Sequence, residues 1–359
     1  MKADWTELQS KTIDALRFPM AVAVVVLHNC KDLILHATGP MKALCIFFQE
    51  GICRLAVPCF FFISGYLFFN RLHEWSWDEW GRKLKNRVRT LLVPYLLWNV
   101  IALLAYWAWY NLHTGPVSLY QQFLEYGGVR MFWSVTGSLP VGSQAFPVDG
   151  PLWFIRDLMF YILATPLVYL FIRRARVYGV LALGVVFLAF RRVVPEGLLF
   201  FVFGAFMQLS GRNVLQTVWP FRTRLLILTS LFLAMTCCLN DVSEYWCRFC
   251  KFFLIVCGIG AAFCLAAWNW ESRKSLSAPF LARSSFFIFA AHEVLILQNV
   301  ARPLVGSVVP MHTGWGDIIA FFLVPALAVA LCLGLLFVMQ KALPRTTGVL
   351  TGSRHLQTA

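Results

Sequence analysis

Charged side chains are scarce in this sequence. Only 13% of its 359 residues are Asp, Glu, Lys or Arg, whereas 59% are hydrophobic. A soluble domain of this length cannot bury so much apolar surface, and it normally exposes more charge. The scarcity excludes an ordinary soluble protein and predicts a chain that crosses a membrane several times.

Paired cysteine patterns are also lacking. The chain has 11 Cys, but they form no disulfide framework, and several lie in apolar runs where Cys usually acts as a small core residue. Cys247 and Cys250 make an isolated CxxC with no second pair, which is a weak signal for a zinc or redox site. We therefore expect no metal.

A cleavable signal peptide is not evident, because Asp14 and Arg17 fall where its apolar core would begin. The first hydrophobic stretch is therefore expected to remain as a membrane helix.

Acidic residues are few compared with basic ones, and the formal net charge is +14. The basic residues cluster in short links between apolar segments, which is the pattern that sets membrane orientation. This distribution favours a lipid bilayer as partner and argues against nucleic acid.

The long apolar runs predict an all-α polytopic membrane bundle of about ten transmembrane helices. The expected spans are 12–35, 44–69, 91–112, 151–172, 177–191, 195–211, 223–240, 246–268, 280–300 and 315–340. Residues 1–345 are expected to form a single membrane domain, followed by a short cytoplasmic tail at 346–359.

The basic links predict that both termini are cytoplasmic. The cytoplasmic links then hold the richer clusters, at 2–11, 71–89, 173–176, 212–224, 273–274 and 341–354. The external links hold few basic residues: Lys42, Arg130, Arg191, Arg192 and Arg302. The long external link at 113–150 could be a lid, a partly re-entrant hairpin or an ordered surface loop.

The first span places Arg17 and His28 in the membrane. Such residues are costly there, and by default they mark a functional site. Eleven residues make about three helical turns, so the two side chains are expected on one face, roughly 16 Å apart along the axis. Pro19 lies between them and can kink the helix. On this topology Arg17 lies near the cytoplasmic end and His28 lies deeper.

Four further motifs carry polar groups. Ser64 and Tyr66 lie in FFFISGYL, where the Ser-Gly pair either packs closely against another helix or supplies a nucleophile. The basic run after it either sets topology or attracts a phosphorylated ligand. Its candidate ligands are Arg82, Lys85, Arg87 and Arg89.

The other two motifs lie in later spans. Trp153, Arg156 and Asp157 lie in PLWFIRDL. Because adjacent helical residues point about 100° apart, Arg156 and Asp157 are expected to find partners on other helices rather than each other. His292 and Glu293 lie in SFFIFAAHE, where the histidine is either a structural hydrogen-bonding group or part of a site.

These motifs occur together and in this order, and together they resemble the acyltransferase 3 family of integral membrane acyltransferases, which includes bacterial polysaccharide O-acetyltransferases. The resemblance covers residues 12 to about 300. It implies transfer of an acyl group, with acetyl-CoA or another acyl-CoA as the cytoplasmic donor, to a hydroxyl of a glycan or lipid-linked sugar. It also implies a multi-pass protein of the plasma (inner) membrane.

The resemblance gives His28 the position of the family's catalytic histidine and Arg17 that of its paired arginine. The family's Arg-x-x-Arg motif is incomplete here, since Arg82 is followed by Lys85 and Asn86 precedes Arg89. We assign the donor to the basic run, and the candidate substrate-binding residues are Ser64, Tyr66, Trp153, Arg156, Asp157, His292 and Glu293.

Acyl transfer to an alcohol needs a general base that removes the hydroxyl proton, and a histidine, with a pKa close to neutral pH, suits this role. His28 is therefore predicted to be the general base. In a variant of this mechanism, His28 forms a covalent acyl-histidine intermediate. The alternative is a transporter or flippase for a glycan or lipid. The lack of obvious half-to-half repeats counts against it.

Overall fold

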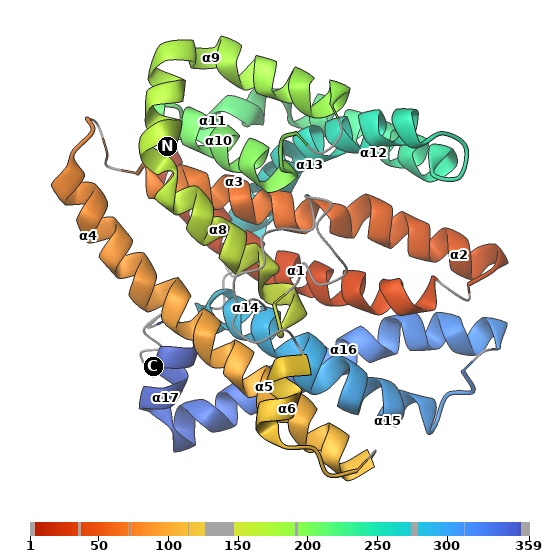
Figure 1. The fold of residues 1–359 in the computed structure, drawn as a ribbon. Helices are drawn as coiled ribbons and strands as arrows, with labels where there is room; N and C mark the ends of the chain where they lie inside the picture. Colours follow the sequence, from red (N-terminus) through yellow and green to blue (C-terminus); the bar gives the residue numbers. More distant parts are fainter. Residues whose placement is uncertain are drawn as a thin grey trace. The chain divides into compact units, whose positions relative to one another are not determined.

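The computed structural model describes residues 4–34, 37–70, 72, 74–113, 115–125, 147–190, 193–273, 279–311 and 313–352. Within these ranges every regular element is a helix (Figure 1), which confirms the all-α prediction. The chain divides into two compact units. The first unit is Met1–Ser76 with Ala164–Ser285, and the second is Trp77–Leu163 with Phe286–Ala359.

The first unit begins with a long helix. The carboxylate of Asp4 caps this helix, α1 (Trp5–Leu33), by accepting a hydrogen bond from the Thr6 amide at 2.9 Å. The elements that follow are α2 (Gly39–Ile46), the π-helix η1 (Phe47–Gly51), the 3₁₀ helix η2 (Ile52–Leu55), α3 (Ala56–Phe68), α9 (Thr165–Ala189), α10 (Glu196–Leu209), α11 (Val214–Val218), η5 (Trp219–Phe221), α12 (Arg222–Leu239) and α13 (Glu244–Arg273).

Glycines bring α3 and α10 into close contact. A Cβ added at Gly65 would overlap the backbone carbonyl of Phe201, and one at Gly204 would overlap that of Phe62. Only glycine permits such an approach of two helix backbones. The close packing predicted for the Ser-Gly pair in α3 is therefore confirmed at Gly65.

Helices α12 and α13 form an antiparallel pair, drawn in teal in Figure 1. Their apolar residues meet along the shared face, where Phe232 stacks on Phe253 with ring centroids 5.4 Å apart. A short turn at 240–243 joins the two helices.

The second unit contains a long helical segment in which α4 (Trp77–Arg87), the π-helix η3 (Val88–Leu92) and α5 (Val93–His113) follow one another without a break. It also holds α6 (Leu119–Glu125), η4 (Gly150–Leu152), α8 (Trp153–Leu163), the π-helix η6 (His292–Ala301), α15 (Arg302–Gly306), α16 (Gly314–Ala342) and α17 (Pro344–Leu350). Helix α14 (Pro279–Ala291) begins in the first unit and ends in the second.

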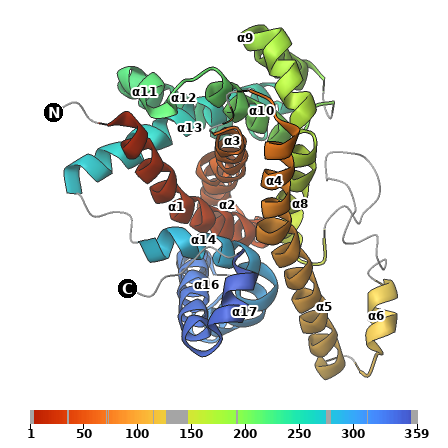
Figure 2. The same cartoon turned by 90° about the vertical axis from the view of Figure 1, so that its left-hand side faces the viewer.

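The second unit is closed by contacts between distant parts of the chain. Figure 2 shows α17 against α16 and α6 beside α5. The indole Nε1 of Trp98 on α5 donates a hydrogen bond to the Leu350 carbonyl of α17 at 3.1 Å. The ring of Trp98 also packs edge-on against Phe287.

Seven helical segments in the described chain are long and apolar enough to cross a membrane. The count rises to eight if α8 and α9 together make one span. Helical residues occupy each of the ten expected segments, but the count of ten is not confirmed. Helix α10 has only 14 residues, and α9 is broken at Arg176, whose φ is 49°. The predicted boundary between spans at 173–176 coincides with this break.

Parts of the sequence-based topology lie outside the described residues. These parts are the centre of the predicted external loop, at 126–146, and seven of the basic residues: Lys2, Arg71, Arg130, Arg191, Arg192, Lys274 and Arg354. The lid or hairpin and the orientation of the termini therefore stay predictions.

Candidate functional site

Arg17 and His28 lie on one continuous helix, α1, with Pro19 inside it. The Nη1 of Arg17 pairs with Asp14 Oδ1, one turn earlier, at 2.9 Å, and both side chains are partly exposed. His28, in contrast, is buried with 6% exposure, and its neighbour Asn29 is also buried. The helix therefore presents a partly exposed cation in its first half and an enclosed imidazole near its end.

A cavity of about 450 Å³ lies against the first half of α1. Asp14, Phe18 and Pro19 form one wall, while α13 and the start of α14 form the others. Apart from Asp14 and Asn269, its lining residues are apolar. A cavity of this size and character suits an extended organic group more than a free ion.

Ser64 and Tyr66 differ in their surroundings. Ser64 is half-buried on α3. The hydroxyl of Tyr66 accepts a hydrogen bond from Gln9 Nε2 at 2.8 Å, while Gln9 Oε1 accepts one from the Leu215 amide at 3.1 Å. Tyr66 therefore links α3 to α1 and, through Gln9, to α11.

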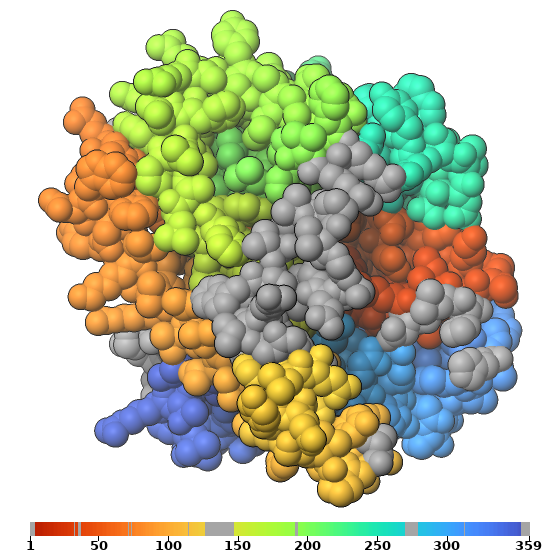
Figure 3. Space-filling model, in the orientation of Figure 1, coloured from red at the N-terminus to blue at the C-terminus, as the bar shows by residue number. Residues whose placement is uncertain are grey.

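Three of the four predicted donor ligands lie on the surface. Arg82, Lys85 and Arg89 are exposed, and the ion pairs of the described chain include none of them. The side chains of α4, orange at the left edge of Figure 3, project from that surface. This cluster can offer its cations to phosphate oxygens without first breaking ion pairs.

The fourth predicted donor ligand, Arg87, lies elsewhere. It lines an apolar cavity of about 170 Å³ together with Arg156, between the α4–η3 segment and α8. The structure thus brings one predicted donor ligand and one predicted substrate-binding residue to the same small cavity.

Arg156 and Asp157 pair with each other, so the prediction that they would not was wrong. Both are buried, at 0% and 3% exposure, and Arg156 Nε and Nη2 each lie 3.1 Å from Asp157 Oδ1. The arginine side chain is long and flexible enough to overcome the 100° angle between neighbours. In a buried site the adjacent carboxylate offsets the cost of removing the guanidinium from water. Trp153, one turn earlier, is half-buried at the start of α8.

His292 and Glu293 begin the π-helix η6. His292 is fully buried, and its Nδ1 lies 2.9 Å from the carbonyl oxygens of Ile288 and Phe289. Because both partners are acceptors, Nδ1 carries a proton, and in the neutral ring Nε2 is then the acceptor atom. η6 extends over ten residues, longer than the single π-turns that often occur at functional sites, so the site role of His292 stays a prediction.

Asp149 is a candidate that sequence analysis missed. It is buried at 1% exposure, and its Oδ1 makes no hydrogen bond to any described residue. Its backbone N–H donates to Asn99 Oδ1 at 3.1 Å, and a Cβ added at the next residue, Gly150, would lie 3.0 Å from Glu293 Oε2. Burial, and secondly the charge of Glu293, raise the pKa of Asp149 well above its ordinary range.

The predicted residues fall into two groups. Arg17, His28, Ser64 and Tyr66 lie in the first unit, whereas the second unit contains the basic run, Trp153, the Arg156–Asp157 pair, His292 and Glu293. In the second unit, Asp149 and Glu293 form an acidic pair that joins the start of η4 to η6. The signal for Asp149 in the sequence was its place in FPVDGPLW, directly before an apolar helix.

Comparisons with known proteins support one family. The chain is 26% identical over 329 residues to the succinoglycan biosynthesis protein ExoH of Rhizobium meliloti (strain 1021), covering 88% of this chain and 84% of that protein. No solved structure matches the chain significantly. A family model described as an acyltransferase domain, Acyl_transf_3, matches residues 10–337. Because that match spans nearly the whole chain, the protein belongs to the acyltransferase 3 family.

Proposed function

We propose that this protein is a multi-pass O-acyltransferase of the plasma (inner) membrane. It moves an acyl group, most simply acetyl, from cytoplasmic acyl-CoA to a hydroxyl of a cell-surface glycan or lipid-linked sugar. The observation that carries the proposal is the enclosed His28 on a continuous α1, in a chain whose family match begins at residue 10.

In the proposed reaction, the neutral imidazole of His28 takes the proton of the acceptor hydroxyl as its oxygen attacks the thioester carbonyl carbon. A C–O bond forms and the C–S bond breaks. The coenzyme A thiolate then takes the proton from the imidazolium. A general base of this kind contributes roughly 10²- to 10⁴-fold to a rate. In a variant, the imidazole is acylated first and the hydroxyl then attacks the acyl-histidine.

The surface cluster Arg82, Lys85 and Arg89 supports a phosphate-bearing donor. These side chains are exposed and make no ion pair with described residues, so they are available for the phosphates of acyl-CoA. Arg17 is partly exposed on the half of α1 predicted to be cytoplasmic, and its neighbours Leu16 and Phe18 line the 450 Å³ cavity. We propose that the acyl-bearing arm of the donor enters this cavity.

The acceptor class is proposed from the relative. ExoH is described as a succinoglycan biosynthesis protein, so we propose a polysaccharide or its lipid-linked precursor as acceptor. Ser64 and Tyr66, in the same unit as His28, and Trp153, Arg156, Asp157, His292 and Glu293, in the other, remain proposed substrate-binding residues.

The test is an acyl-transfer assay with the purified full chain reconstituted into lipid membranes. With labelled acetyl-CoA and the producing cell's de-O-acylated polysaccharide, His28→Ala is expected to lower transfer roughly 10²- to 10⁴-fold. The matched control is His113→Ala, since His113 is exposed and stacked on Trp109. Wild-type transfer by His28→Ala would rule out His28 as base, whereas counterflow of unmodified glycan without any acylation would instead indicate a transporter.

A further inference from the structure

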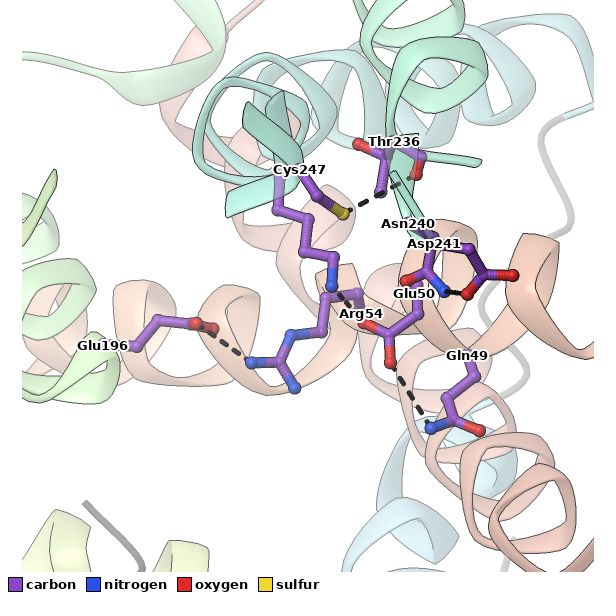
Figure 4. A network of polar contacts seen from close by, with 9 residues as sticks. Gln49, Glu50, Arg54, Glu196, Thr236, Asn240, Asp241 and Cys247 are labelled. Carbon is purple, nitrogen blue, oxygen red and sulfur yellow. Dashed lines mark hydrogen bonds and ion pairs between the residues drawn. The ribbon is translucent and has the colours of Figure 1, made fainter. Parts of the chain in front are cut away.

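The first unit contains a polar cavity of about 350 Å³ that the proposed reaction has not used. Its walls come from η2, the end of α9, the start of α10, the turn after α12, and α13. Figure 4 shows a network of polar contacts that includes four of the lining residues: Arg54, Glu196, Asn240 and Cys247. Its volume falls within the range of small-molecule sites, which is about 300–1,000 Å³.

Two ion pairs between helices border the cavity. Arg54 Nη2 on η2 lies 3.2 Å from Glu196 Oε2 on α10, and the two side chains are 44% and 27% exposed. Lys251 Nζ on α13 lies 2.6 Å from Glu50 Oε2 on η1. Arginine has five N–H donors and a lysine ammonium has three, so each cation keeps donors beyond the one it gives its carboxylate.

A third cation, Arg248, lines the cavity without an acidic partner among the described residues. Its Nη2 donates a hydrogen bond to the Leu188 carbonyl at 3.2 Å, and its guanidinium lies 5.9 Å from the ring centroid of Tyr245. These contacts hold the guanidinium in place while leaving other N–H groups for a ligand.

Aromatic and amide groups complete the lining. Phe187 and Phe252 lie with their ring centroids 5.8 Å apart, and Phe200 forms a buried part of the wall. The side chain of Asn240 also borders the space. Cationic donors, carboxylate acceptors and apolar rings in one cavity match a polyol ring, whose hydroxyls both donate and accept hydrogen bonds and whose C–H faces are apolar.

The cavity lies near the helix that carries His28. Cys30, two residues after His28 on α1, lies close to Cys45 and Cys53. Cys53 directly precedes Arg54, and η2 packs against α1. The basic links of the sequence predict that the ends of the helices around this cavity face the outside of the cell.

We propose that this cavity binds one sugar unit of the acceptor glycan through Arg54, Arg248 and Lys251. The proposal rests on the proposed function and adds the place where the acceptor is held. Glu196 and Glu50 orient the cations and offer acceptors to sugar hydroxyls. The cavity holds one sugar unit and so positions the whole glycan. The hydroxyl that His28 deprotonates can belong to another sugar unit of the same glycan.

The experiment measures glycan binding and catalysis separately on the purified full chain in detergent. The probe is short oligosaccharides from the producing cell's de-O-acylated surface polysaccharide, with binding followed by saturation-transfer NMR. We expect Arg248→Gln and Lys251→Met each to raise the Kd for these oligosaccharides about tenfold to hundredfold, because each removes charged hydrogen bonds. The KM for glycan is expected to rise in parallel, while kcat and the KM for acyl-CoA stay within about twofold.

The matched control is Lys11→Met. Lys11 also pairs with a glutamate, Glu7, but lies on the first turns of α1 and does not border the cavity. Lys251→Arg keeps the positive charge, so it is expected to keep most of the wild-type oligosaccharide binding. Arg248→Gln still tests the proposal if Lys251→Met does not fold. Folded Arg248→Gln and Lys251→Met proteins that bind the oligosaccharides with wild-type Kd would overturn the proposal.

The outcomes separate this proposal from the function it rests on. A wild-type protein that binds the oligosaccharides through Arg248 and Lys251 but transfers no acyl group supports the cavity and contradicts the acyltransferase reaction. A wild-type protein that transfers acyl groups while the cavity variants behave as wild type supports the reaction and contradicts the cavity.

Discussion

The ion pairs that join distant segments of the first unit differ from the enclosed Arg156–Asp157 pair of the second unit. In the first unit, the ion pairs Arg54–Glu196, Lys251–Glu50 and Lys42–Asp241 join residues far apart in sequence, and their side chains keep 22% to 59% exposure. In the second unit, Arg156 and Asp157 are adjacent in sequence and almost fully enclosed. Partly exposed pairs can connect helices and still meet a solute, whereas enclosed charges depend on their immediate partner for the fold itself.

Removing one member of the enclosed pair is expected to have the largest effect on stability. Arg156→Met leaves the Asp157 carboxylate buried without its partner, which should cost about 3–5 kcal/mol of unfolding free energy. The measurement is thermal or denaturant unfolding of the purified chain in detergent. The double variant Arg156→Met with Asp157→Leu removes both charges and is expected to recover most of the loss. Equal losses in the single and double variants would show that the pair is not the cause.

Asp149 provides a second test of enclosed charge, with an intermediate effect. The pKa of the Asp149 carboxyl is higher in the folded protein than in the unfolded chain, where it is about 3.9. The protonated carboxyl therefore stabilises the fold fully below about pH 3.9, and this stabilisation is lost as the pH rises through the folded pKa. Asp149→Asn cannot ionise, so it should be more stable than wild type at neutral pH, by on the order of 1–3 kcal/mol.

That advantage of Asp149→Asn should disappear as the pH falls toward 4, which unfolding curves at several pH values would detect. The control is Asp241→Asn, since Asp241 is exposed and paired with Lys42. Its pKa is lowered by that partner, so its dependence on pH should have the opposite sign. If Asp149→Asn were more stable than wild type by the same amount at every pH, ionisation of Asp149 would not be the cause of the difference.

The partly exposed pairs of the first unit are expected to give the smallest change in stability. Arg54→Met breaks the pair with Glu196, but solvent can screen the remaining carboxylate, so the loss should stay below about 1 kcal/mol. The measurement is the same unfolding experiment, repeated at high salt, where the difference should shrink further. A loss as large as that of Arg156→Met would remove the distinction between partly exposed and enclosed ion pairs.

The sequence predicted the helical segments better than the contacts between distant residues. Helical residues occupy each of the ten expected segments, but apolar length did not predict the helices α4, α6, α11 and α17. The Ser-Gly pair of α3 predicted the close contact that Gly65 makes with α10. The break at Arg176 matched a basic link. These features depend on neighbouring residues, which a sequence displays directly.

The features that were missed depend on residues far apart in the chain. Asp149 becomes notable only when Glu293, more than a hundred residues later, lies beside it. The polar cavity joins Arg54 to Lys251 and has no local motif. The Arg156–Asp157 pair was predicted wrongly for another reason, since the direction of a Cα–Cβ bond does not fix where a long side chain ends.

The π-helix η6 has a consequence for comparing relatives of this protein. A π-turn closes each hydrogen bond over five residues instead of four, so it holds an extra residue compared with an α-helical turn. A homologue that lacks one residue between 292 and 301 could therefore keep the same helix ends and span the same distance as an ordinary α-helix. A one-residue gap in an alignment at this place would mark the loss of that wide turn, and with it a rotation of Glu293 relative to the residues that follow.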